Sequence, residues 1–170
     1  SFPTRRSSDL SVQALMPSGH TLVAGGWDWT EDRRGLLLIT PTSEVGQNGQ
    51  STIELEYLTI LLPDAVAQEL GLAGQAEGEP DGQGPRVFDP EAALVLMREL
   101  EGREGVELLA VPRITTASGQ AASVGLTSDA TPFALNFEAL PTVTADGLID
   151  LRNVGLIKGV PPGGSTSPQP

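Results

Sequence analysis

The chain has 170 residues, of which 10 are basic and 22 acidic, and it contains no cysteine. Its formal net charge of −12 repels phosphate groups, so neither nucleic acid nor an anionic membrane surface is an expected partner. The lack of cysteine excludes disulfides, thiolate zinc sites and a cysteine nucleophile. No apolar run approaches the roughly 18 residues of a membrane helix, and the length suffices for one or two small domains.

Residues 1–10 (Ser-Phe-Pro-Thr-Arg-Arg-Ser-Ser-Asp-Leu) resemble the in-frame translation of a common sequencing-library adapter. The alternative is a genuine basic N-terminus, but we attribute residues 1–10 to the adapter and expect the natural sequence to start at about residue 11, within a gene. The chain is therefore expected to be a fragment. Removing Arg5, Arg6 and Asp9 takes two from the basic count and one from the acidic count and leaves a net charge of −13.

The first part of the chain alternates short apolar stretches with turn residues. Gly25 and Gly26 are expected to end the second of these stretches, and Pro41 the third. Residues 42–50 carry no periodicity and are predicted to be a linker. The three predicted strands are residues 12–16, 20–24 and 36–41.

A second unit is predicted from residue 51 to residue 160. Ile53, Leu55 and Tyr57 alternate with glutamates, which indicates a half-buried strand. The run becomes continuously apolar from Leu58, so the strand is expected either to be buried on both faces or to shift phase through a bulge. One or two helical turns are expected in residues 64–72, followed by a flexible loop over residues 73–86.

An amphipathic helix is predicted over residues 89–101. Asp89 is a natural N-cap, Pro90 suits the first helical position, and Gly102 is expected to end the helix in a left-handed conformation. Four apolar residues at helical spacing form one stripe: Ala93, Leu96, Met97 and Leu100.

The last part of the unit is predicted to consist of strands in hairpins. Residues 106–111 and 121–126 are expected to be strands joined through a turn at Ser118 and Gly119. Alternating residues from Phe133 lead to a hairpin turn at residues 146–147. Residues 161–170 form a flexible tail by composition. The predicted fold class is α+β, with mainly antiparallel β-hairpins and one amphipathic helix.

The polar residues suggest few catalytic or ligand-binding sites. His20 is the single histidine, and without cysteines it makes a poor ligand or catalyst. Glu54 and Glu56 share a strand face about 7 Å apart, which is conceivable for acid–base work on a glycoside but is more simply a solvated face.

There are four further candidate sites, and each has an equally simple structural explanation. The candidates are a weak cation site at Asp28, Glu31 and Asp32, a phosphate loop at Gly25 and Gly26, a packing surface at Trp27 and Trp29, and a nucleophile at Ser118. No catalytic, cofactor-binding or metal site is predicted, and the chain is not expected to be an enzyme.

Several segments resemble the core of the secretins, the ring-forming outer-membrane channels of bacterial secretion and pilus systems. Residues 110–116 (Ala-Val-Pro-Arg-Ile-Thr-Thr) are similar to the Ser-Ala-Pro-Arg-Val-Thr-Thr-like segment that ends a strand of that core. Residues 140–147 (Leu-Pro-Thr-Val-Thr-Ala-Asp-Gly) are similar to its long hairpin. Residues 18–26 resemble its Gly-Gly strand, and residues 36–41 its closing strand.

The order of these segments departs from the family. The closing elements come first, which suggests a tandem array in which residues 11–41 end one secretin-like unit and residues 51–160 begin the next. Only about nine residues, 27–35, stand where secretins place the lip segment. These residues are too few for the lip through which the family inserts into the outer membrane.

The resemblance implies a structural role in protein secretion. It implies a homo-oligomer formed through β-strand edges, secretion-system or cell-envelope partners, and a place in the periplasm or outer membrane of a Gram-negative-type bacterium. The alternative is a cell-envelope scaffold or binding module that reuses the fold without forming a pore.

Overall fold

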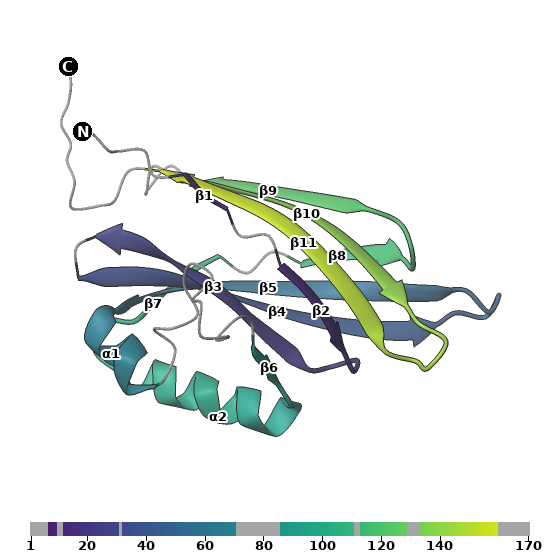
Figure 1. Cartoon of the computed structure of the whole chain (residues 1–170), viewed down its shortest axis with the longest axis horizontal. Coiled ribbons are helices and arrows are strands. Elements are labelled where there is room, and N and C mark those ends of the chain that lie inside the picture. The colour runs from purple at the N-terminus through teal and green to yellow at the C-terminus, as the bar shows by residue number, and fades with distance from the viewer. Residues whose placement is uncertain are drawn as a thin grey trace, which may run out of the picture.

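The computed structural model describes residues 7–9, 12–30, 32–70, 86–110, 113–128 and 133–159. Three layers are visible in Figure 1: one β-sheet, a second β-sheet packed against it, and two helices on the far side of the second sheet. All described strand pairs are antiparallel. The predicted α+β class with mainly antiparallel pairing is therefore confirmed. The predicted flexible tail lies outside the described residues, as does nearly all of the predicted loop over residues 73–86.

We name the two sheets A and B. Sheet A contains β1 (Ser7–Asp9), β2 (Val12–Met16), β9 (Ala122–Ser128), β10 (Phe133–Val143) and β11 (Ile149–Gly159). Sheet B contains β3 (Thr21–Thr30), β4 (Arg33–Val45), β5 (Ser51–Pro63), β6 (Arg86–Phe88), β7 (Glu107–Ala110) and β8 (Arg113–Ala117). The helices are α1 (Asp64–Glu69) and α2 (Pro90–Glu101).

The predicted linker over residues 42–50 was wrong. β4 runs through Pro41 to Val45 and pairs with β5 along its whole length, leaving only a tight turn at residues 46–50. Proline is tolerated because the β3–β4 pairing ends at Ile39, so beyond that residue β4 has a neighbour on one side only. Each of the two predicted units contributes strands to both sheets, so the units are not separate domains divided at this point.

Two further expectations about glycines were wrong. Gly25 and Gly26 do not end the second strand, because β3 continues to Thr30 and absorbs them through a register shift next to Ala24. Gly102 has a φ of −86°, so it is not a left-handed stop; Gly105, with a φ of +86°, takes that conformation instead.

The start of α2 is as predicted. The Asp89 carboxylate accepts a hydrogen bond of 2.7 Å from the Ala92 N–H, and Pro90 occupies the first turn. Leu96 and Leu100 are buried against sheet B, which confirms the predicted apolar stripe. The short helix α1 confirms the helical turns expected in residues 64–72.

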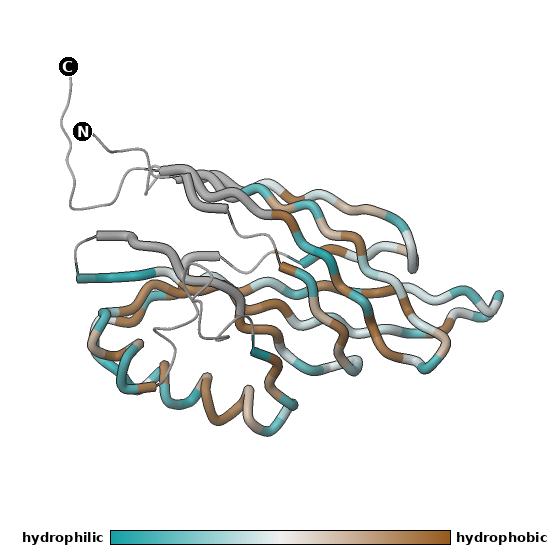
Figure 2. Tube along the Cα trace, viewed as in Figure 1, coloured by the Kyte–Doolittle hydropathy of each residue, from teal (hydrophilic) through white to brown (hydrophobic). Residues whose placement is uncertain are grey.

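β5 lies at the centre of the core because it is buried on both faces. Leu55 and Leu61 face the layer between the two sheets, whereas Ile60 and Leu62 face the helices. The continuous apolar run predicts this double burial, and the pairing with β7 also shifts register next to Thr59. Figure 2 shows the hydrophobic stretches of sheet B lying over the helices.

An internal repeat appears in the turns. In the turn between β2 and β3, the Gly19 N–H donates to the Pro41 carbonyl at 2.8 Å. The Ser18 Oγ accepts a 2.9 Å hydrogen bond from the Ser43 N–H. Gly19 has a φ of +87°, which a glycine adopts without strain.

The turn between β8 and β9 repeats each of these features one hundred positions later. The Gly119 N–H donates to the Pro141 carbonyl at 2.8 Å, and the Ser118 Oγ accepts from the Val143 N–H at 2.8 Å. Gly119 has a φ of +84°. Ser118 is thus a turn residue, as predicted, but it also ties the turn to β10.

The repeat extends to the strands, so β2–β5 and β8–β11 are two copies of one arrangement. Each copy lends its first strand to the sheet of the other: β8 pairs with β5, and β2 pairs with β11. β1 lies within the residues attributed to the adapter. It pairs with β11 at the position that corresponds to the pairing of β7 with β5. The pair Val23–Leu38 is equivalent to Ser123–Glu138, the pair Pro41–Leu55 to Pro141–Leu151, and the pair Ile53–Thr116 to Ile149–Met16.

Replacing Ser18 or Ser118 with alanine should lower the free energy of unfolding by about 1 kcal/mol in each case. Each substitution removes the acceptor of one partly buried backbone N–H. Urea unfolding of both variants measures this, with Ser123→Ala on the exposed face of β9 as a control expected to change stability by less than about 0.5 kcal/mol. A loss in only one of the two variants would show that the repeated turns are not energetically equivalent.

Candidate functional site

The two glutamates of the predicted strand face are held by one arginine. The Arg113 guanidinium lies 3.2 Å from the Glu54 carboxylate and 3.1 Å from the Glu56 carboxylate. β8 brings Arg113 directly opposite Glu56. Two carboxylates that share a guanidinium are accounted for by strand pairing, so nothing in their geometry requires a reaction.

The other polar candidates do not converge. The described residues contain no group of three histidine, aspartate or glutamate side chains that could hold a metal ion. Within the described region, His20 is half-buried and its Nδ1 has no hydrogen-bond partner. Asp32 is exposed. The candidates Trp27, Asp28, Trp29 and Glu31, and the side-chain surroundings of Gly25 and Gly26, lie outside the side chains that the structure describes.

A buried polar pair joins the two sheets. The Tyr57 hydroxyl, from β5, donates a 2.7 Å hydrogen bond to Asn153 Oδ1, from β11. The two residues occupy equivalent positions of the repeat, so the bond connects the two copies at their centre. Phe137 stacks on the Tyr57 ring with the ring centroids 4.9 Å apart. Burial raises the pKa of Tyr57 well above its usual value because the phenolate would lose its hydration.

A hollow of about 210 Å³ lies where α2 crosses sheet B. The hydroxyls of Thr21 and Thr40 are hydrogen-bonded to each other at its wall, 2.7 Å apart. Ligand sites usually measure roughly 300–1,000 Å³, so this hollow is smaller than a typical ligand site.

Sheet A has two open edges in the described part of the chain. β9 pairs only with β10, and β2 pairs only with β11. Neither strand contains a charged residue or a proline, two of the devices that protect an exposed edge from pairing. In sheet B, by contrast, the equivalent edge of β3 is covered by β6.

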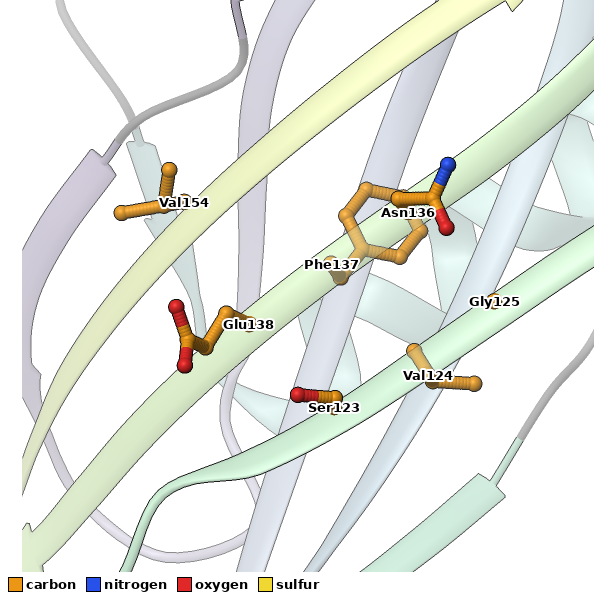
Figure 3. A pocket seen from close by; sticks show the side chains of 7 residues that line it. All are labelled: Ser123, Val124, Gly125, Asn136, Phe137, Glu138 and Val154. Carbon is orange, nitrogen blue, oxygen red and sulfur yellow. The ribbon is translucent and has the colours of Figure 1, made fainter.

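A shallow depression of about 380 Å³ borders the β9 edge on the outer face of sheet A. Glu138 is one of the lining residues and lies between its partners on the adjacent strands, Ser123 on one side and Val154 on the other (Figure 3). Glu138 is exposed, whereas its neighbours Phe137 and Ala139 face the core. No hydrogen bond or ion pair holds the Glu138 carboxylate among the described side chains, so it is available to a ligand at this edge.

The site was only partly predictable. Alternation from Phe133 predicts that Asn136 and Glu138 face outwards, and this is confirmed. That β9 is an edge strand depends on which strands pair across the whole chain, and no local signal in residues 121–126 shows it. Neither α1 nor α2 is long and apolar enough to span a membrane. No family model matches the chain, and searches of curated proteins and of solved structures found no similar protein.

Proposed function

We propose that the chain is a structural assembly component, similar to the secretins of bacterial protein secretion, whose copies associate side by side through sheet A. The observation that carries the proposal is the pair of uncharged open edges formed by β9 and β2. Open edge strands without charge or proline are templates for pairing with another chain. The expected place of action is the bacterial cell envelope.

The direction of the strands suits such an assembly. β2, β11, β10 and β9 are adjacent in this order and every pair is antiparallel, so the two edge strands run antiparallel to each other. β9 of one copy can therefore pair in antiparallel fashion with β2 of the next, and the sheet continues from copy to copy. Contacts of this head-to-tail kind generate rings or filaments.

A scaffold without a pore is the second candidate. At the position where secretins carry the lip segment, β3 and β4 form a closed hairpin in which Thr30 pairs with Arg33. A hairpin this tight leaves no room for an inserted lip. The scaffold proposal keeps the edge pairing and omits channel formation.

Self-association of the chain should increase with protein concentration and with salt. Each copy carries a net charge of −12, and salt screens the repulsion between copies because the Debye length falls to about 3 Å at 1 M. Ser123→Lys on the β9 edge should weaken the association. Sedimentation velocity over a range of salt concentrations measures both effects.

Thr142→Lys is the matched control, because it adds the same charge to the outer face of β10, away from either edge. Equal weakening by both substitutions would point to charge rather than to edge pairing. A chain that stays monomeric at every concentration and salt level would contradict the proposed assembly.

A further inference from the structure

The internal repeat shows what the open edge of β9 lacks. In sheet B, β6 pairs with the start of β3, placing Arg86 opposite Val23 and Phe88 opposite Thr21. The equivalent residues of the second copy are Ser123 and Ala121 at the start of β9, where no described strand pairs. The repeat thus contains one strand position that is filled in sheet B and open in sheet A.

The side chains beside the open position on β9 differ from those beside β6, and the difference indicates which ligand the open position would bind. β3 and β9 have the same register with their neighbours, so Leu38 in sheet B corresponds to Glu138 in sheet A. Leu38 is buried beneath the helices, whereas Glu138 is exposed beside Ser123. An incoming strand therefore meets a carboxylate and a shallow depression rather than an apolar layer.

We propose that the β9 edge at residues 121–125 binds an extended segment of a partner protein, in the antiparallel register that β6 takes on β3. A lysine or arginine of that segment lies opposite Ser123 and reaches the Glu138 carboxylate, which is the depression's acidic side chain. The chain's own β6 provides the precedent, since it places Arg86 at the corresponding position. Backbone hydrogen bonds supply the affinity of such a complex, and the side-chain pair supplies the selectivity.

This inference goes beyond the proposed assembly and does not depend on it. A second molecule of this protein and a partner segment would nevertheless compete for the same edge. A bound segment would therefore also stop the addition of further molecules to the assembly. A capped peptide, acetyl-Arg-Val-Arg-Val-Arg-Val-amide, is a suitable test ligand because in an extended strand its basic residues share one face and its apolar residues the other. The full chain is used at a dilution where it is monomeric.

Binding should protect the backbone amides of residues 121–125 from hydrogen exchange and shift their amide NMR signals. A peptide methylated at every backbone nitrogen keeps the charge but cannot form the ladder, and it should not bind. Equal binding of both peptides would overturn the proposal, because it would show charge attraction alone. Absence of binding by the unmethylated peptide, or protection elsewhere but not on β9, would also overturn it.

Glu138→Gln should weaken binding of the peptide by about two- to five-fold, the range of an exposed ion pair. Glu44→Gln, at an exposed acidic residue of sheet B that does not line the depression, removes the same charge and should leave binding unchanged. Equal affinities of the Glu138→Gln and Glu44→Gln variants would overturn the assignment of Glu138. Peptide binding to a chain that never self-associates would support this inference while contradicting the proposed assembly, so the two fail separately.

Discussion

Replacing Phe137 with alanine should lower the free energy of unfolding by about 3–5 kcal/mol. The Phe137 side chain is 3% exposed and stacks on the Tyr57 ring, so its removal leaves a cavity between the two sheets and breaks an aromatic pair. Small domains are stable by only about 5–15 kcal/mol, so a loss of this size removes much of the total. Chemical unfolding followed by tryptophan fluorescence measures it.

Val154→Ala is the control for this substitution. Val154 lies on the adjacent strand β11 with its side chain 57% exposed, so the same kind of truncation should cost less than about 0.5 kcal/mol. If Phe137→Ala cost as little as the control, the packing between the sheets would not be what stabilises the fold.

The second large effect is a loss of stability at alkaline pH that depends on Tyr57. Burial raises the pKa of Tyr57 in the folded state above its unfolded value of about 10. Folding therefore favours the neutral phenol. The contribution of the buried phenol to the free energy of unfolding is fully present below a pH of about 10 and is lost as the pH rises further. The loss should be about 1.4 kcal/mol for each pH unit above that value.

Tyr57→Phe removes the ionisable group and tests this dependence. At neutral pH the variant should be less stable by about 1–3 kcal/mol, because Asn153 loses its hydrogen-bond partner while its Nδ2 already has none in the described structure. Above pH of about 10 the difference should shrink and then reverse. Tyr57 is the single tyrosine, so phenolate absorbance reports its ionisation directly. Parallel stability curves for the two proteins across this range would refute the prediction.

A double substitution separates the hydrogen bond from the packing. Tyr57→Phe combined with Asn153→Leu removes both buried polar groups and should recover most of the stability lost in Tyr57→Phe. Asn153→Leu alone should be destabilising at neutral pH, because it leaves the Tyr57 hydroxyl buried without its acceptor.

Local patterns predicted many elements of the fold and failed wherever a partner strand decided the outcome. Asp89 and Pro90 determine the start of α2 without help from the rest of the chain. The extent of β4 was underestimated because Pro41 usually ends a strand, and only its one-sided pairing with β5 allows it to continue. β8 was missed as a strand because its residues, Arg113–Ala117, show little alternation of their own.

The internal repeat leaves a trace in the sequence, but turn residues alone do not establish it. Ser18-Gly19 and Pro41-Thr42 recur as Ser118-Gly119 and Pro141-Thr142 at the same spacing. These are turn residues, and turn residues are common in any β-rich chain, so the pattern gained meaning only when both turns were found to make the same hydrogen bonds. The candidate site depends on that repeat, because the repeat identifies the strand position that β9 leaves open.

The sequence by itself determined the alternation of strands and turns, the amphipathic helix and the acidic, cysteine-free character of the chain, since these follow from neighbouring residues and from composition. The tertiary structure decided that the two copies exchange their first strands, that Tyr57 and Asn153 meet across the sheets, and that β9 is an edge. Tyr57 and Asn153 are 96 positions apart in the chain. Contacts over such distances depend on how whole sheets pair and pack, which no local periodicity encodes.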